Sequence, residues 1–372
     1  QVPAPADIEA AAKALLEAEH PMIWAGAGVL FAGATDELRK LAELIWIPVF
    51  CTMPGKSAFD ERHPLALGAG SRATTLPAYQ WIQDCDVLLA LGSSLTWSLY
   101  GQYVPPGKTI IHNTDNPDDI NKNESVTHPL LGDARLTIAA LIETLEDLGA
   151  VSGSESRWPW VLEKMAKFRS QWMEQWQPLL NSNEEPLNTY RVIDDINRTL
   201  DRENSIVTHD AGAPRDSIVP FYTATKPHSY VGWGKTTHLG FGIPLMIGAK
   251  MAHPDKFCLN LMGDGAFGMS GMDLETSARA GVQITTVVLN NGGMATYPPT
   301  MFPTALEDYG MSKMGSDYAK IAEGMGVSGL RVVKVSEMAP ALEEAQRLNG
   351  EGRTVLIDVS SNMEGRRSRW DR

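Results

Sequence analysis

The sequence predicts an α/β protein built from two doubly wound parallel-sheet domains. Short apolar runs rich in β-branched residues alternate with segments whose apolar residues recur at helical spacing, and glycine-rich turns follow several of the runs. With 372 residues, the chain is long enough for two such domains. We expect a Rossmann-like domain over 1–148, a linker with a tryptophan-rich helix over 149–186, and a second domain with a C-terminal tail over 187–372.

Composition excludes some classes of partner. A formal net charge of -13 disfavours a nucleic-acid surface, which needs a basic patch. No apolar run approaches the roughly 18 residues that a membrane helix requires. The three cysteines (Cys51, Cys85 and Cys258) are far apart in apolar surroundings, which is typical of core residues in a reducing, cytoplasmic compartment. Residues 1–6 resemble an interdomain linker, so we expect another domain before them.

The first domain is predicted from alternating elements. A helix starting at Asp7 and running to about residue 18 is followed by a short strand, and a second helix covers 35–44. The expected strands are 21–24, 48–51, 87–92 and 109–112. Between the first strand and the second helix lies Gly26-Ala27-Gly28, either a tight strand-to-helix turn or a nucleotide site at a helix N-terminus.

Further helices and strands are expected in the remainder. Residues 151–156 suit a flexible linker, and 158–180 suit a helix whose aromatic stripe packs between domains, because the acidic charge disfavours base stacking. Helices are expected at 187–200, 317–325 and 340–348, and another helix is expected to end at residue 252. Strands are expected at 205–208, 332–335 and 355–359.

The most informative stretch begins with an apolar strand at 257–262, followed by Gly263-Asp264-Gly265. A helix at 272–280, a β-branched strand at 284–289 and Asn290-Asn291-Gly292-Gly293 come next. This is a parallel βαβ unit, and it places Asp264 and Asn291 at the carboxyl ends of neighbouring strands, where open α/β sheets bind ligands.

The residue types there suit a metal and a diphosphate. The Asp264 carboxylate, the Asn291 amide oxygen and a carbonyl near Gly293 are hard oxygen ligands, and Mg²⁺ is usually held by few protein oxygens with phosphate and water completing its shell. Backbone amides at the strand-to-helix turn can donate to phosphate; they belong to Gly263, Gly265, Ala266 and Phe267.

Gly-Asp-Gly followed at this spacing by Asn-Asn resembles the thiamine-diphosphate-binding motif, and almost the whole chain resembles the acetolactate-synthase-like and 2-hydroxyacyl-CoA lyase group. The resemblance implies that the cofactor's amino group bonds the carbonyl of Thr237, that Leu239 is the apolar wedge under the bent cofactor, and that His238 faces the substrate as a candidate catalytic residue. The loop at Gly212 would contact the diphosphate through its backbone. Relatives often have a Gln-His pair in that loop, where this chain has Ala213 and Pro214.

The resemblance leaves the first domain's ligand open. In this group the domain is an empty relic, an FAD site, or a site for ADP or the ADP part of CoA. Relatives carry a carboxylate pattern before a proline where this chain has Asn113-Thr114-Asp115-Asn116-Pro117, and the partial loss of acidic residues counts against a bound dinucleotide.

Substrate contacts are expected in the segment after Gly293, where relatives differ. Apolar side chains with a polar handle predict a mostly apolar pocket there, formed by Met294, Tyr297, Met301 and Glu307. The basic end, 366–372, is either a frayed tail, or a lid or clamp for CoA phosphates.

In the family a glutamate from a pyrimidine-binding domain activates the cofactor, and no residue of this chain matches it. We therefore expect a partner domain or subunit and a dimer or tetramer. The favoured function is a carbon–carbon lyase or ligase similar to 2-hydroxyacyl-CoA lyase. Acetolactate synthase or a 2-oxo-acid decarboxylase is the alternative, and a non-catalytic cofactor-binding subunit is an alternative of another class.

Overall fold

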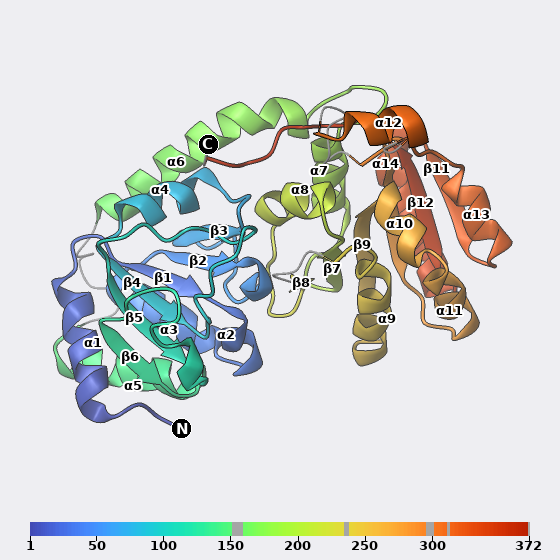
Figure 1. Ribbon diagram of the computed structural model, residues 1–372. Coiled ribbons are helices and arrows are strands. Elements are labelled where there is room, and N and C mark those ends of the chain that lie inside the picture. Colours follow the sequence, from blue (N-terminus) through green and yellow to red (C-terminus); the bar gives the residue numbers. More distant parts are fainter. Residues whose placement is uncertain (151–158, 234–237, 295–300, 311–312, 371–372) are drawn as a thin grey trace. The chain divides into compact units, whose positions relative to one another are not determined.

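The computed structural model describes residues 1–150, 159–233, 238–294, 301–310 and 313–370 (Figure 1). The chain forms two compact units. Unit 1 comprises Gln1–Gln175, Ala224–His228 and Ser368–Arg372, and unit 2 comprises Trp176–Thr223 and Ser229–Arg367. The boundaries expected at 148 and 186 remain a prediction.

Unit 1 is built on a six-stranded parallel sheet with the order β3-β2-β1-β4-β5-β6, which is the doubly wound order of Rossmann folds. Its strands are β1 (Met22–Ala25), β2 (Val49–Thr52), β3 (Ala66–Gly70), β4 (Val87–Leu91), β5 (Thr109–Thr114) and β6 (His128–Leu131). Two of them, β3 and β6, were not predicted. β3 contains small residues and glycine apart from Leu67, and β6 contains Pro129, which is tolerated because β6 lies at the sheet edge.

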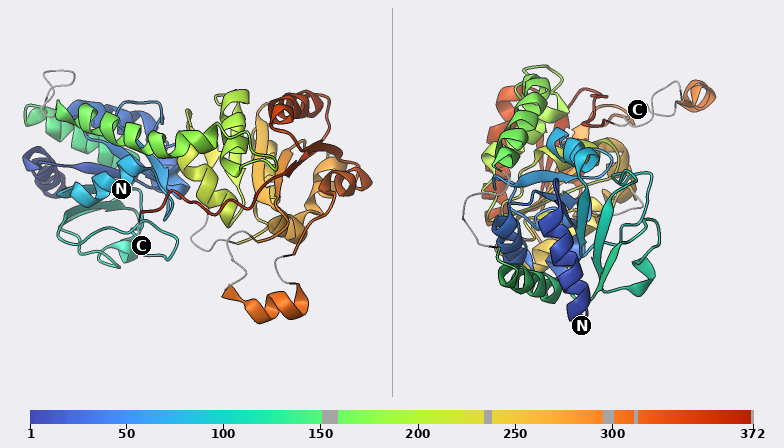
Figure 2. Two further views of the ribbon diagram at one scale, coloured as in Figure 1. Left: turned by 90° about the horizontal axis from the view of Figure 1, so that it is seen from above. Right: turned by 90° about the vertical axis from the view of Figure 1, so that its left-hand side faces the viewer.

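Helices cover both faces of this sheet (Figures 1 and 2). They are α1 (Pro5–Glu17), α2 (Ala27–Phe31), α3 (Thr35–Ile45), α4 (Leu76–Asp84), α5 (Ala134–Asp147) and the first part of α6 (Trp160–Leu180). The aromatic stripe predicted on α6 is packed: Trp160 stacks on Trp81 with ring centroids 5.8 Å apart, and Trp172 is buried.

Unit 2 contains a second six-stranded parallel sheet, with the order β11-β12-β10-β9-β7-β8. Its strands are β7 (Ser205–His209), β8 (Tyr230–Val231), β9 (Phe257–Gly263), β10 (Thr285–Asn290), β11 (Ser328–Val332) and β12 (Val355–Ser360). Apart from Phe257 at the start of β9, the apolar side chains of the inner strands are buried, as expected for a parallel sheet covered on both faces. The predicted fold class, two doubly wound parallel sheets, is confirmed.

The helices of unit 2 are α7 (Thr189–Thr199), α8 (Ala213–Phe221), α9 (Gly242–Ala252), α10 (Asp264–Ser270), α11 (Asp273–Arg279), α12 (Pro303–Tyr309), α13 (Tyr318–Gly324) and α14 (Val335–Gly350). The strand predicted at 332–335 is misplaced: the strand is β11, which ends at Val332, and the prediction is wrong for 333–335. The β-branched residues there lead into α14, because Glu337 Oε2 accepts the N–H groups of Val333 (2.8 Å) and Lys334 (3.0 Å) and so caps the helix.

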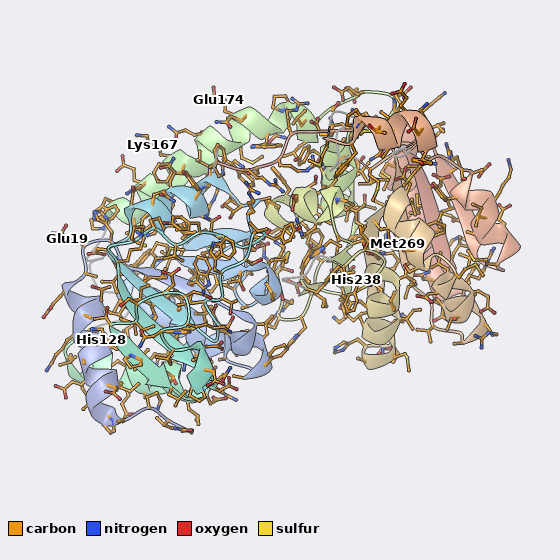
Figure 3. All side chains as sticks on the ribbon, in the orientation of Figure 1. Glu19, His128, Lys167, Glu174, His238 and Met269 are labelled. Atoms are coloured by element: carbon orange, nitrogen blue, oxygen red, sulfur yellow. The ribbon has the colours of Figure 1, made fainter. Side chains whose placement is uncertain are left out.

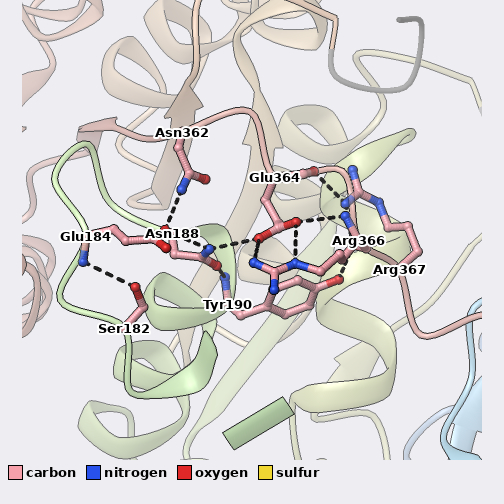
Figure 4. A network of polar contacts seen from close by, with 8 residues as sticks. All are labelled: Ser182, Glu184, Asn188, Tyr190, Asn362, Glu364, Arg366 and Arg367. Carbon is pink, nitrogen blue, oxygen red and sulfur yellow. Dashed lines mark hydrogen bonds and ion pairs between the residues drawn. The ribbon is translucent and has the colours of Figure 1, made fainter. Parts of the chain in front are cut away.

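The C-terminal stretch is held in place, so the expectation of a frayed tail is wrong for its described part. In unit 2, Tyr190 donates to the carbonyl of Arg366 at 2.6 Å, and Glu364 accepts from Asn188 at 2.9 Å (Figure 4). In unit 1, fully buried Ser368 accepts from Trp172 Nε1 at 2.9 Å and donates to the Thr74 carbonyl at 2.5 Å. None of the helices in the described ranges is both long and apolar enough to traverse a bilayer.

Candidate functional site

The candidate site lies where β9 and β10 end side by side. Leu289 pairs with Gly263 at the end of the ladder, so the residues that follow each strand meet at one edge of the sheet. Asp264, 3% exposed, spans the two strand ends: its Oδ1 accepts the N–H of Gly265 at 2.8 Å, and its Oδ2 accepts the N–H of Gly292 at 2.9 Å. The predicted juxtaposition of the Gly-Asp-Gly and Asn-Asn motifs is present in the structure.

The environment of Asp264 suits a bound cation. Burial raises the pKa of its carboxyl group, whereas the N–H groups of Gly265 and Gly292 act in the opposite direction. These partners are neutral amides, so a dication at the remaining lone pairs would offset the cost of desolvating the carboxylate. Among the described residues, no cluster of three His, Cys, Asp or Glu side chains could hold a metal by itself, so a metal here would draw on amide, carbonyl and ligand oxygens.

Asn291 and Gly293 lie in the turn that Asp264 holds. Asn291 is half-buried, and its Oδ1 accepts the N–H of Gly293 at 3.1 Å. Gly292 has φ +76°, a left-handed conformation that favours glycine, and its carbonyl accepts the N–H of Met314 at 2.8 Å. The turn therefore presents the Asn291 side chain and nearby backbone carbonyls at the same edge as Asp264.

The preceding residue, Asn290, is fixed by a group that the sequence did not single out. Its Nδ2 donates to Oδ1 of the fully buried Asp358 on β12 at 2.9 Å, and to the carbonyl of Ser316 at 2.9 Å. The other carboxylate oxygen of Asp358 accepts the N–H of Tyr318 at 2.9 Å and pairs with Arg331. Only the alternation of side chains along a predicted strand could have indicated that Asp358 faces inward.

The start of α10 supplies the amides expected at the diphosphate. Ala266 and Phe267 are buried, and the Phe267 ring packs edge-on against Tyr318 with centroids 5.1 Å apart. Their side chains therefore belong to the core, and only their backbone groups remain for a ligand. Pro214 flanks the same turn, because a Cβ placed on Gly263 would lie 3.8 Å from its Cγ. Gly212, at φ +83°, is the N-cap residue directly before α8 in that loop.

The segment expected to carry the cofactor's rings is described from residue 238 onward, and Thr237 lies outside the described residues. His238 is exposed (labelled in Figure 3), and half-buried Leu239 packs against the core of unit 2. A Cβ on Gly240 would lie 3.2 Å from Met269 Cβ, so this turn rests on α10.

Of the three expected substrate residues that the structure describes, Met294 is the one placed at the site. A Cβ on Gly265 would lie 3.5 Å from Met294 Cγ, so Met294 covers the Gly-Asp-Gly turn. Met301 and Glu307 are exposed, and α12 buries none of its side chains and stands away from the sheet in Figure 2. Tyr297 lies outside the described residues.

In unit 1, the turn after β1 has a structural explanation. Gly26 donates to the carbonyl of Leu91 at 2.9 Å and Gly28 to that of Gly92 at 2.8 Å. A Cβ on Gly26 would be 2.3 Å from the Gly92 oxygen, and α2 is only five residues long. The close approach of this turn to the backbone at Gly92 therefore accounts for both glycines. This agrees with the first of the two interpretations, a tight strand-to-helix turn.

Comparisons with known proteins agree with this geometry. The family described as "Thiamine pyrophosphate enzyme, central domain" matches residues 8–141, and "Thiamine pyrophosphate enzyme, C-terminal TPP binding domain" matches residues 210–359. The second match contains the whole Asp264 site.

Two similar curated proteins are named acetolactate synthase large subunits. The chain is 31% identical over 364 residues to a probable acetolactate synthase large subunit of Methanocaldococcus jannaschii, which covers 95% of this chain and 60% of that protein. It is 32% identical to the acetolactate synthase large subunit of Corynebacterium glutamicum, covering 94% of this chain and 56% of that protein. The chain thus spans about 60% of the length of such relatives. With both family domains present, the chain belongs to the thiamine pyrophosphate (thiamine diphosphate) enzymes.

Proposed function

We propose that unit 2 binds thiamine diphosphate through Mg²⁺ at the edge where β9 and β10 end. We further propose that the chain acts in an acetolactate-synthase-like reaction, making or breaking a carbon–carbon bond next to the carbonyl of a 2-oxo acid. The observation that carries the proposal is the buried Asp264 carboxylate bonded to both strand ends, beside Asn291.

Each group has a defined task in this proposal. The Asp264 carboxylate, the Asn291 amide oxygen and the Gly293 carbonyl would hold Mg²⁺, and free backbone amides near Gly265 would face the diphosphate. Thiamine diphosphate supplies a carbon nucleophile and an electron sink when it is bound. Leu239 would support the cofactor by apolar contact, and exposed His238 would face the substrate as a proton donor or acceptor.

Two observations favour a 2-oxo acid over an acyl-CoA, and thus reverse the order of the two hypotheses stated above. The two relatives described above are named acetolactate synthase large subunits. The tail arginines proposed as a phosphate clamp also have other partners: Arg366 pairs with Glu364 at 2.7 Å, and Arg367 donates to the Glu364 carbonyl at 2.7 Å. These contacts leave the two guanidinium groups less available for CoA phosphates.

A pyrimidine-binding domain or subunit completes the proposed enzyme, as a dimer or tetramer. Apolar side chains beside the candidate site are exposed: Phe241 by 39%, Met269 by 61% and Met272 by 70%. Covering such side chains is a common consequence of association. Native mass spectrometry in Mg²⁺ and thiamine diphosphate tests this, and a stable lone chain with full activity would contradict it.

The cofactor proposal is tested by calorimetric titration of thiamine diphosphate into Asp264→Asn at fixed Mg²⁺. Because the substitution removes the charged ligand, we expect binding to fall at least about 100-fold. Asp201→Asn is the matched control, since Asp201 precedes β7 and so lies at the opposite, amino edge of the sheet. Wild-type affinity in Asp264→Asn would refute the metal assignment. Pyruvate and CoA-thioester screens then separate the two substrate classes.

A further inference from the structure

A second buried carboxylate lies just after β7, the strand next to β9. Asp210 follows β7 directly, is fully buried, and its own N–H donates to the Leu261 carbonyl on β9 at 2.8 Å. The sheet ladder thus fixes the backbone from which this side chain projects. Because β7 and β9 are parallel, Asp210 stands at the same edge as Asp264.

The side chain of Asp210 holds a remote segment by its backbone. Oδ1 accepts the N–H of Ala211 at 2.8 Å and that of Gly240 at 3.0 Å, and Oδ2 accepts the N–H of Gly242 at 2.9 Å. Gly242 is the first residue of α9, so the carboxylate also lies at the positive end of an 11-residue helix. Two of the three bonds reach about thirty residues along the chain.

The two anchored amides lie directly after the residues expected to contact the cofactor, His238 and Leu239. Gly240 has φ +85°, which sets the direction of the chain at that point. Leu239, just before it, packs against the core, and His238 is exposed. The other side of the turn rests on α10, where a Cβ on Gly240 would be 3.2 Å from Met269 Cβ and from Ser270 Cβ.

Burying the Asp210 carboxylate is unfavourable. Burial raises its pKa, and the N–H groups of its three partners oppose this only in part. Capping α9 alone does not require it, since a Ser or Asn at the helix N-cap serves that purpose with no buried charge. A carboxylate that accepts from Gly240 and Gly242 together instead fixes the turn on both sides of Phe241.

We propose that Asp210 is a positioning residue that fixes the turn at 238–242, and thereby places Leu239 and His238 for the rings of thiamine diphosphate. This inference rests on the cofactor site proposed above and adds a residue that touches neither metal nor cofactor. Fixing the turn requires both oxygens of the carboxylate. An Asn at position 210 would keep one acceptor oxygen but would turn its NH₂ group toward an N–H donor.

The test uses hydrogen exchange of the full chain, read by mass spectrometry, on Asp210→Asn and wild type. Without cofactor, we expect exchange over 238–242 to accelerate on the order of tenfold in the variant, while β9 and β10 stay protected. With Mg²⁺ and rising thiamine diphosphate, we expect the concentration for half-maximal protection of this turn to rise on the order of tenfold. Asp201→Asn, whose carboxylate accepts the N–H of Glu203 at 3.1 Å at the other end of β7, should match wild type in both.

Every outcome of this experiment either supports or overturns the positioning role of Asp210. Unchanged exchange over 238–242 in Asp210→Asn overturns the inference, and so does a loosened turn with a wild-type half-protection concentration, which would make Asp210 merely structural. A wild type that the cofactor does not protect contradicts the proposed function and overturns the inference with it. If Asp210→Asn does not fold, Asp210→Glu is measured instead. It keeps the charge on a longer side chain, so we expect its exchange rate over 238–242 and its half-protection concentration to lie between those of wild type and those expected for Asp210→Asn.

Discussion

Asp264 and Gly292 are joined by a 2.9 Å hydrogen bond from the backbone N–H of Gly292 to Oδ2 of Asp264. The bond connects the residue after β9 to the turn after β10, so the proposed metal ligand also holds the turn that carries Asn291. Loss of the turn's geometry should therefore weaken metal binding even when every proposed ligand is retained.

Gly292→Ala tests this coupling. At φ +76° an Ala is strained, and its Cβ would lie 3.4 Å from the Met314 carbonyl, so we expect a loss of about 1–2 kcal/mol in the free energy of unfolding and weaker Mg²⁺-dependent cofactor binding. Gly268→Ala is the control, because it lies inside α10 with open space around its Cβ, and it should be neutral or stabilising. Equal behaviour of the two variants in denaturant titration and calorimetry would contradict the coupling.

Gly242→Ala is expected to disturb the start of α9. The new Cβ would lie 2.2 Å from Oδ1 of Asn260, a fully buried side chain on β9 that has little room to move. We expect a loss of about 2–3 kcal/mol by chemical denaturation. The double variant with Asn260→Ala should recover at least about 1 kcal/mol, since it removes the clashing atom.

Gly248→Ala is the control for this pair, because it lies within α9 with open space around its Cβ. It should be neutral or stabilising. Strict additivity of Gly242→Ala and Asn260→Ala would show that the predicted clash does not exist.

Glu364 is expected to make the docked tail sensitive to acid. Burial alone would raise its pKa, but hydrogen bonds from Arg366 and Asn188 outweigh it and hold the pKa at about 2 (Figure 4). A lowered folded-state pKa stabilises the fold above the ordinary value of 4.5, and this contribution is lost as the pH falls from 4.5 toward 2.

Glu364→Gln should therefore lose on the order of 1–2 kcal/mol at pH 7, and much less than that relative to wild type near pH 3. Denaturant titrations at the two pH values measure this. Glu344→Gln is the control, because its Arg347 partner lies on the exposed face of α14 and such pairs contribute little. A Glu364→Gln penalty that is the same at both pH values would rule out the ionic origin.

The sequence was sufficient for the fold class and for the juxtaposition of Asp264 and Asn291, because both depend on local patterns: apolar strands, glycine turns and the edge rule for parallel sheets. It failed at 332–335, where a local helix cap outweighs strand propensity. Val333 and Val335 have high strand propensity, yet Glu337 caps a helix there.

Asp210 and Asp358 were missed for a related reason. Each is a single acidic residue in or after an apolar strand, and its importance comes from partners about thirty to seventy residues away, Gly240 and Gly242 for the first and Asn290 for the second. One sequence gives no spacing rule for such contacts. The chain's length and composition likewise could not separate a 2-oxo acid from an acyl-CoA.

Asn113→Asp is the last prediction, and it concerns the stretch first considered as an altered dinucleotide site. Asn113 is fully buried: its Nδ2 donates to the carbonyls of Leu130 (3.0 Å) and Gly132 (2.9 Å), and its Oδ1 accepts the N–H of Gly92 at 3.2 Å. An ionised Asp would turn a buried carboxylate oxygen toward two carbonyls, so we expect a loss of about 3 kcal/mol or more in unit 1 at pH 7.

The loss should shrink near pH 5, because a protonated carboxyl group can donate to one of these carbonyls and its pKa would be raised by burial. Asn116→Asp is the control: Asn116 is exposed, accepts the Asp118 N–H at 3.2 Å as an Asp also could, and should stay within about 0.5 kcal/mol of wild type. Denaturant titration of both variants at pH 7 and pH 5 makes the measurement. A pH-independent penalty, or none, would mean that Asn113 does not tie β5 to β6 by donating, and the stretch would again be open to interpretation as a ligand site.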